Sequence, residues 1–255
     1  MWPGSPVVRQ SRKAPSKVTK ANPDWAALVG YDAPALRSAN AAAVELVRGP
    51  LEETAADLPG VVVNGAIGPR GDGYVDSGRV DPDRAADYHQ PQVAALAAAG
   101  ADLVAAYTLT GTGEAIGVVR AARSVGVPVG ISFTVETDGR LPDGTTLADA
   151  VQEVDAAAAP DHFLVNCAHP THVALGLAEP GDWRGRILGT RVNASTLSHA
   201  ELDAATALDE GDLGLLVSSQ DALRPLLPNL AVVGGCCGTD ARHVAALWGV
   251  AVTHG

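Results

Sequence analysis

Short runs of β-branched and other apolar residues alternate with longer alanine-rich stretches along most of the chain. The longer stretches carry apolar residues at helical spacing, and the short runs are typical of buried strands. An alternation of this kind indicates βαβ units that build a parallel sheet. Six strands are predicted, at residues 61–66, 102–107, 127–133, 162–167, 186–192 and 230–235.

The helices between these strands have recognisable ends. Asp81 and Pro82 stand where a helix that runs to Ala99 would begin, and Gly100 follows its last residue. Proline at the first helical position and glycine after the last are the usual signals for these boundaries. Gly126 similarly ends a helix predicted over residues 116–125.

The front of the chain fits this repeating pattern less well. Residues 1–60 offer one good helix, at about 33–56, and no convincing strand. A closed (β/α)8 barrel needs eight strands and typically about 250 residues. We therefore predict an α/β fold, a (β/α)8 barrel of the TIM type that is incomplete, with about six clear β/α units.

Composition divides the chain into a short tail and one domain. Residues 1–20 contain five basic residues and no acidic one, which predicts a disordered basic tail without an assigned function. The remainder, residues 21–255, is expected to form a single barrel domain, since 47% of the 255 residues are hydrophobic.

The formal net charge of −11 limits the classes of partner. Nucleic acid and anionic membranes bind clustered cations, so we expect neither as a partner and favour small molecules. The apolar runs are far shorter than the roughly 18 residues that span a membrane, and the first residues lack the apolar core of a secretory signal. These features predict a cytoplasmic protein.

Three cysteines stand at the ends of two predicted strands. Cys167 ends the run at 162–167, and Cys236 and Cys237 directly follow the last strand. Carboxyl ends of parallel strands meet on the face where barrel enzymes build their sites, so the three sulfurs are expected to lie together. Neighbouring side chains on a strand point to opposite faces, so the adjacent pair can share one metal only if the backbone turns sharply.

Three thiolates would leave one position of a tetrahedral zinc ion open, which is typical of a catalytic site. A substrate thiol bound there would become a thiolate at neutral pH. Two alternatives remain open at this point. Cys167 alone could be a buried packing residue, and the glycine-rich segment 234–238 could bind phosphate.

The two cysteine motifs carry a family resemblance. Asn166-Cys167 after an apolar strand, together with Gly234-Gly235-Cys236-Cys237-Gly238, resembles the homocysteine S-methyltransferase family. Supporting matches are the segments 65–69, 132–134 and 139–144, so that the resemblance covers roughly residues 60–245.

The resemblance implies a (β/α)8 barrel that binds one Zn²⁺ through Cys167, Cys236 and Cys237. It further implies transfer of a methyl group to the thiol of homocysteine, giving methionine. Nothing in the chain could house a cobalamin module, so the preferred donor is a sulfonium, S-methylmethionine or S-adenosylmethionine. The partners expected are thus a thiol amino acid and a methyl donor.

The chain departs from the family pattern in two places. An opening strand with an Asp-Gly-Gly loop that holds the amino acid has no counterpart in residues 1–60, so the barrel is expected to be truncated at its N-terminus, with at most a reduced strand at 18–19. After the strand at 102–107, many members carry an acidic residue, where this chain has Ala106-Tyr107-Thr108. A ligand for the ammonium group of the substrate is therefore expected to be lost.

Other polar residues near the strand ends are weaker candidates for substrate or metal binding. Asn166 is expected to support substrate binding, by a hydrogen bond to a thiolate or by holding its loop. His169 and His172 are expected to be solvated loop residues rather than zinc ligands. Glu114 and Glu136 are interpreted as surface carboxylates, although either could replace the lost ammonium ligand.

Three hypotheses for the whole chain follow. It is an active methyltransferase, an inactive or binding-only remnant that keeps zinc, or an unrelated barrel enzyme that binds phosphate after its last strand. The acidic charge and the paired cysteines disfavour the third. A partial barrel would expose two strand edges, so we also predict a homodimer that covers them.

Overall fold

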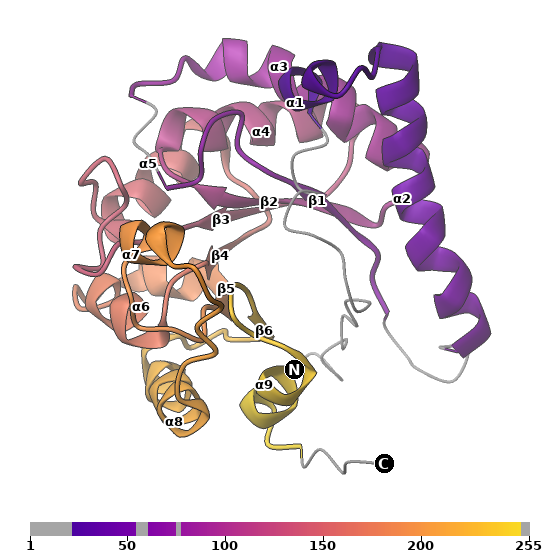
Figure 1. Cartoon of the computed structure of the whole chain (residues 1–255). Helices are drawn as coiled ribbons and strands as arrows, with labels where there is room; N and C mark the ends of the chain where they lie inside the picture. Colours follow the sequence, from indigo (N-terminus) through magenta and orange to yellow (C-terminus); the bar gives the residue numbers. More distant parts are fainter. Residues whose placement is uncertain (1–21, 55–60, 75–77, 251–255) are drawn as a thin grey trace.

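The computed structural model describes residues 22–54, 61–74 and 78–250. Its centre is a sheet of six parallel strands in the order β1 to β6, so that every strand pairs with its neighbour in sequence. The sheet is curled rather than flat (Figure 1). The strands are β1 Asn64–Ile67, β2 Leu103–Leu109, β3 Val129–Phe133, β4 His162–Asn166, β5 Ile187–Val192 and β6 Val232–Gly235. The predicted parallel α/β fold with six β/α units is confirmed, and the described strands form an incomplete barrel.

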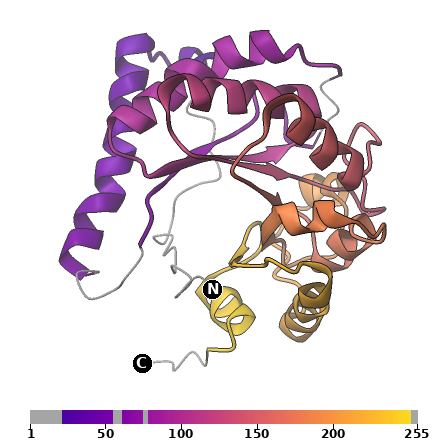
Figure 2. The same ribbon diagram turned by 180° about the vertical axis from the view of Figure 1, so that it is seen from behind.

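Most helices lie along the outer side of the curled sheet, as the two opposite views show (Figures 1 and 2), whereas α7 lies at the carboxyl end of the sheet beside Cys167. The helices are α1 Pro23–Leu28, α2 Ala33–Thr54, α3 Pro82–Ala98, α4 Thr112–Val125, α5 Leu147–Ala158, α6 Pro170–Gly176, α7 His199–Ala204, α8 Leu213–Leu223 and α9 Ala241–Leu247. Short 3-10 helices occupy Asp182–Arg186 and Arg224–Leu226. None of the described helices combines the length and the apolar character that a membrane span requires.

The predicted helix boundaries have the expected physical basis. The Asp81 side chain accepts hydrogen bonds from the backbone N–H groups of Asp83 and Arg84, and Pro82 is the first residue of α3. Gly126 ends α4 in the left-handed conformation at φ 72°, which glycine adopts without strain. Helix α4 begins earlier than predicted, because residues from Thr112 onward continue the helix behind an extended Gly111.

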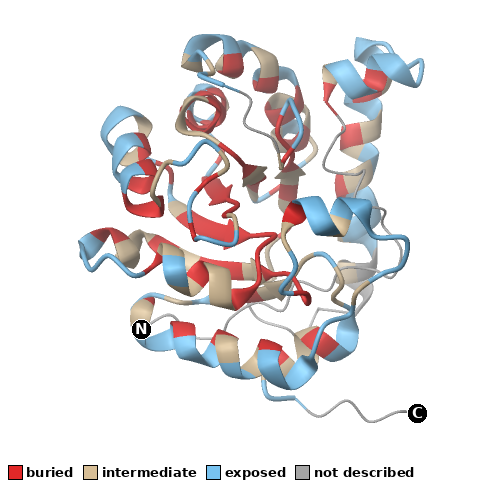
Figure 3. Ribbon diagram, turned by 60° about the vertical axis from the view of Figure 1, so that its left-hand side comes forward, coloured by how far each residue is buried: buried red, intermediate tan, exposed pale blue. Residues whose placement is uncertain are grey.

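The two faces of the sheet differ in character. Its outer face packs against the helices through a large apolar cluster that includes Phe133 and Phe163, and buried residues concentrate in this layer (Figure 3). The inner face carries a smaller cluster of Ala105, Tyr107 and Leu164 together with polar side chains. The outer face therefore holds the core, and the inner face is available for a site.

Several expectations about the front of the chain lie outside the described residues. These include the basic tail at 1–20 and the reduced strand at 18–19. Within the described residues, β1 and β6 each pair with one strand, so both outer edges of the sheet lack a second partner there.

Candidate metal centre

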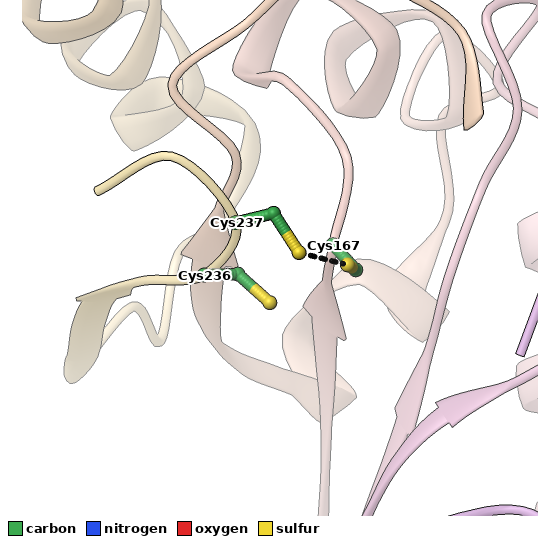
Figure 4. Close-up of side chains that lie close together, drawn as sticks. All are labelled: Cys167, Cys236 and Cys237. Carbon is green, nitrogen blue, oxygen red and sulfur yellow. Dashed lines mark hydrogen bonds between the residues drawn. The ribbon is translucent and has the colours of Figure 1, made fainter. Parts of the chain in front are cut away.

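The three cysteine side chains lie together at the carboxyl ends of β4 and β6. Their sulfur atoms all lie within 4.8 Å of one another, and the Sγ atoms of Cys167 and Cys237 are 3.5 Å apart (Figure 4). Cys167 is buried, Cys236 is half-buried and Cys237 is exposed. The expected meeting of these residues across 70 positions of sequence is therefore found in the structure.

The backbone turns at both ends of the cluster. Cys167 has φ 59°, an uncommon left-handed conformation for a residue with a side chain, and it ends β4 one residue earlier than predicted. Gly238 adopts φ 76° directly after the cysteine pair. These turns let Cys236 and Cys237 direct their sulfurs to one point although they are adjacent in sequence.

Asn193 connects the two cysteine segments. Its Nδ2 donates to the carbonyl oxygen of Cys167 at 2.9 Å, and its Oδ1 accepts from the backbone N–H of Cys237 at 3.1 Å. Further backbone bonds run from Cys167 N to Arg191 O and from Cys236 N to Val192 O. Strand β5 and Asn193 thus hold β4 and β6 at a fixed separation, a role that the sequence analysis missed.

Tyr74 is a second neighbour of the sulfurs that sequence reasoning missed. Its hydroxyl lies 3.0 Å from Cys167 Sγ and 3.7 Å from Cys237 Sγ. The ring stacks on the imidazole of His199, with centroids 4.3 Å apart. Tyr74 belongs to the loop after β1, and its position at the carboxyl end of a strand was the one available sequence signal.

His199 links the cysteine loop to a carboxylate. Its Nε2 lies 2.6 Å from the carbonyl oxygen of Cys167, and its Nδ1 lies 2.8 Å from Glu136 Oε1. Both partners are acceptors, so a ring nitrogen that carries a proton can donate to either of them. His199 begins α7, where the Ser198 and Glu201 capping box fixes the start of the helix.

Mutual hydrogen bonding divides the protons unequally among the thiols. Hydrogen bonds from Cys167 and then Cys236 lower the pKa of Cys237 to about 2, with a smaller contribution from the Tyr74 hydroxyl. Hydrogen bonding to Cys236 and Cys237, followed by burial, raises the pKa of Cys167 well above its ordinary value. Burial, followed by the charges of the cysteines, raises the pKa of Tyr74. These hydrogen bonds favour the thiolate at Cys237 over Cys167, and the Tyr74 hydroxyl is placed to donate to it.

Asn166 lies on the inner side of β4. Its Oδ1 accepts from Ser132 Oγ at 2.6 Å and from Thr108 N at 2.8 Å, while its Nδ2 donates to Thr108 Oγ1. Thr108 has φ 61°, so these bonds stabilise an uncommon backbone conformation at the end of β2. The contacts agree with a loop-holding role, and direct contact with a substrate stays a prediction.

Two expectations about charged neighbours are wrong. His169 is buried rather than solvated, because its Nδ1 caps the start of α6 next to Thr171. Glu114 is buried rather than exposed, because its carboxylate pairs with His89 and accepts from the backbone N–H of Arg70. Glu114 is thereby occupied within the fold.

The crevice beside the cysteines holds the other two residues considered. Glu136 and His172 line it together with Asn193 and His199. Glu136 is partly exposed and engaged by His199, and His172 is half-buried. Neither side chain belongs to the group of potential metal ligands in the described part of the chain.

The sulfur cluster fits a tetrahedral metal site. With metal–sulfur bonds of about 2.3 Å, the edges between sulfurs in such a site measure about 3.8 Å. The observed separations, from 3.5 Å for one pair to at most 4.8 Å, therefore need only small side-chain rotations to close around an ion. Three thiol ligands, with no fourth member of the group among the described residues, leave one position for an exogenous ligand.

Comparison with known proteins places this geometry in a family. The family model described as "Homocysteine S-methyltransferase" matches residues 20–250. A curated relative, Homocysteine S-methyltransferase YbgG of Bacillus subtilis (strain 168), is 29% identical over 130 residues, covering 48% of this chain. That match spans 41% of the relative's own length.

Solved structures of the homocysteine methyltransferase MmuM from Escherichia coli share the fold. The metallated form matches with a TM-score of 0.66 at 22% identity, over 91% of this chain and 76% of that one. The oxidised form matches with a TM-score of 0.68 at 24% identity, over 92% and 77%. Since the family model covers most of the chain, the protein belongs to the homocysteine S-methyltransferase family.

Proposed function

We propose that the protein transfers a methyl group from a sulfonium donor, S-methylmethionine or S-adenosylmethionine, to the thiol of homocysteine, giving methionine. The observation that carries this proposal is the group of three sulfurs within 4.8 Å at the carboxyl end of a parallel sheet. Cys167, Cys236 and Cys237 would hold the metal, which we infer to be Zn²⁺. Family membership supports the reaction class.

When bound, zinc would lower the pKa of the substrate thiol and keep it as a thiolate at neutral pH. In the reaction the thiol loses its proton, its sulfur forms a bond to the methyl carbon, and the donor leaves as a neutral thioether. The net products are methionine, the demethylated donor and one proton. The protein must therefore align two reactants rather than supply a strong base.

The residues around the cysteines are suited to holding this arrangement. Asn193 joins the segments of Cys167 and Cys237, and the Tyr74 hydroxyl faces both of their sulfurs. The His199 ring contacts the carbonyl oxygen of Cys167 through Nε2 and the carboxylate of Glu136 through Nδ1, and so holds the Cys167 loop in place. Preorganised donors of this kind keep the thiolates in place without reorganisation during the reaction.

The wider architecture belongs to the same proposal. We infer a single domain over residues 21–255, an incomplete barrel of the (β/α)8 type, and a cytoplasmic location. We also infer a homodimer, because the outer edges of β1 and β6 each lack a strand partner among the described residues.

Metal analysis tests the ligand assignment. The wild-type protein should bind one zinc per chain and form methionine from homocysteine and S-methylmethionine, and Cys236→Ser should lose both. His172→Gln is the matched control, because this half-buried histidine lies beside the site and should leave the zinc content unchanged. Zinc without turnover would support the binding-only alternative, and a wild-type protein that binds no zinc would refute the metal centre.

A further inference from the structure

Arg191 is the one arginine within the six described strands, and it lies on the inner face of the sheet near the cysteines. Thr190 and Val192 contact α8 residues on the outer side of β5, through Gln220 and Leu216. Since side chains alternate along a strand, Arg191 faces the inner side. There its guanidinium carbon lies 4.7 Å from the centre of the Tyr107 ring.

The guanidinium group of Arg191 has unused hydrogen-bonding capacity. It donates from Nη2 to the carbonyl oxygen of Gly235 at a long 3.4 Å, whereas a guanidinium carries five N–H donors. The ion pairs of the described residues involve Arg48, Arg70, Arg120, Arg123, Arg186, Arg224 and Arg242, and Arg191 is not among them. Among the described residues this half-buried cation has no carboxylate partner, although its charge acts on the nearby thiol of Cys236, so a carboxylate ligand would stabilise it.

The strands of the sheet contribute no carboxylate that could pair with Arg191. None of the six strands contains an aspartate or a glutamate. Tyr107 occupies β2, where its hydroxyl accepts from Asn64 Nδ2 and its ring supports the guanidinium. The described strands therefore present a positive charge on an aromatic support at the inner face and contribute no carboxylate for an ammonium group.

The position of Arg191 suits a thiol substrate held at the cysteines. Arg191 pairs with Asn166 of β4 and with Gly234 of β6, so Cys167 and Cys236 follow these partners by one and two residues. At about 3.3 Å per residue, the backbone of Arg191 therefore lies one to two residue steps before the cysteines along the strand direction. The sulfur and carboxylate carbon of homocysteine are four bonds apart, roughly 5 Å when extended. The charge of Arg191 acts on the thiol of Cys236, so the guanidinium lies on the side from which the carboxylate of a metal-bound thiol could meet it.

We propose that Arg191 binds the carboxylate of the thiol acceptor and makes the site selective for thiols that carry an acidic group. This inference rests on the proposed function, since it takes the cysteine centre to be the thiol site. Recognition of the acceptor then depends on its carboxylate more than on its ammonium group. The acceptor class is that of aliphatic thiol carboxylates, of which homocysteine is one.

Three thiols and a spectroscopic readout test the proposal. Homocysteine, 4-mercaptobutanoate, which lacks the amino group, and 3-aminopropanethiol, which lacks the carboxylate, are titrated into the Co²⁺-substituted protein. Sulfur-to-cobalt charge-transfer absorption reports thiol binding without turnover. The two carboxylate thiols should bind roughly 10- to 100-fold more tightly than 3-aminopropanethiol, the range expected for a charge-assisted hydrogen bond.

Variants assign this selectivity to Arg191. Arg191→Met should remove the preference for carboxylate thiols and leave the affinity for 3-aminopropanethiol unchanged, and Arg191→Lys should keep part of the preference. Arg224→Met is the matched control, since this exposed arginine pairs with Asp221 outside the sheet and should behave as wild type. Metal content and circular dichroism verify that each variant is folded.

Each outcome separates this inference from the proposed function. Equal weakening of all three thiols in Arg191→Met would show that the arginine balances the charge of the sulfurs, and the carboxylate role would be wrong. A wild-type preference for 3-aminopropanethiol would also overturn it. Selective binding without methyl transfer would refute the proposed reaction alone, methyl transfer without selectivity would refute the Arg191 role alone, and failure of every thiol to bind would refute both.

Discussion

At the scale of single residues, the surroundings of the three sulfurs decide their chemistry. Cys237 is the exposed thiol, and it is also the one whose pKa is lowered, chiefly by a hydrogen bond from Cys167. Tyr74 adds a hydroxyl that faces two of the sulfurs. Reactivity should therefore be concentrated at Cys237, and Tyr74 should tune it.

Replacing Tyr74 by phenylalanine tests this tuning. Loss of the hydroxyl removes one of the hydrogen bonds that lower the pKa of Cys237. The pH midpoint for alkylation of Cys237 by iodoacetamide, measured after chelator treatment, should rise in Tyr74→Phe. Zinc affinity should fall roughly 3- to 10-fold, as for one hydrogen bond of about 1 kcal/mol. The exposed Tyr31→Phe serves as control, and an unchanged alkylation profile in Tyr74→Phe would contradict the role.

His169 makes stability depend on pH. Burial lowers its pKa from 6.5 to about 4, so the unfolded chain binds a proton more readily than the native protein does. Stability is therefore fully present above pH 6.5 and is lost as the pH falls toward 4, by about 2 kcal/mol between pH 7.5 and 5.

Chemical denaturation at several pH values measures this dependence. Asparagine is a good helix N-cap that does not titrate, so His169→Asn should retain α6 and show a smaller loss of stability on acidification. The difference between the two proteins isolates His169 from the other histidines. Parallel stability curves for the two proteins would show that His169 does not contribute to the acid sensitivity.

The cysteine positions could be predicted from the sequence, whereas their partners could not. Cys167, Cys236 and Cys237 follow apolar strands, and parallel strands bring their carboxyl ends together. Asn193 and His199 lie in and after a loop without periodicity, so nothing local indicates that they reach Cys167. Contacts that depend on three-dimensional loop paths leave no pattern along the chain.

At the scale of elements, the strands were predictable because each is a short apolar run between helices. Their bounds were less so: the first predicted strand began at residue 61, whereas β1 begins at Asn64. Val63 lies outside the regular strand ladder. Its backbone N–H donates to the Asp102 carboxylate, and its carbonyl oxygen accepts from the backbone N–H of Asp102. Burial favours apolar residues on both sides of a strand end, so hydrophobicity alone does not locate that end.

The spacing of β5 and β6 depends on Gly189. A Cβ atom at this position would lie 2.5 Å from Val232 Cβ and 2.6 Å from the Val232 carbonyl oxygen, a backbone atom that cannot move aside. Gly189→Ala should therefore cost about 1–3 kcal/mol of unfolding free energy and disturb zinc binding through β6. Thermal unfolding and metal analysis measure the two effects.

Gly234→Ala provides the matched control on the neighbouring strand. Its Cβ would lie 3.5 Å from Arg191 Cγ, an ordinary contact, so the variant should remain close to wild type in stability and zinc content. Equal stability of the two alanine variants would contradict the view that β5 and β6 are held at this distance by Gly189.

At the scale of the whole molecule, the curled sheet determines both the site and the contacts that the protein can make. Its outer face is covered by helices, and its two outer strands each have one partner in the described part of the chain. Unpaired strand edges favour association. Sedimentation equilibrium should therefore give twice the chain mass of 25.9 kDa, and a monomer at micromolar concentration would contradict this expectation.

The central claim is methyl transfer at the three-cysteine centre, and transfer of an isotopic label tests it most directly. Zinc-loaded protein is incubated with homocysteine that carries deuterium on its carbon chain and with S-methylmethionine in which both sulfonium methyl groups are trideuterated, and the products are analysed by mass spectrometry. The account predicts methionine that carries both labels in the wild-type reaction and its loss in Cys167→Ser. Formation of no doubly labelled methionine by zinc-loaded wild-type protein, with S-adenosylmethionine tested likewise, would contradict it.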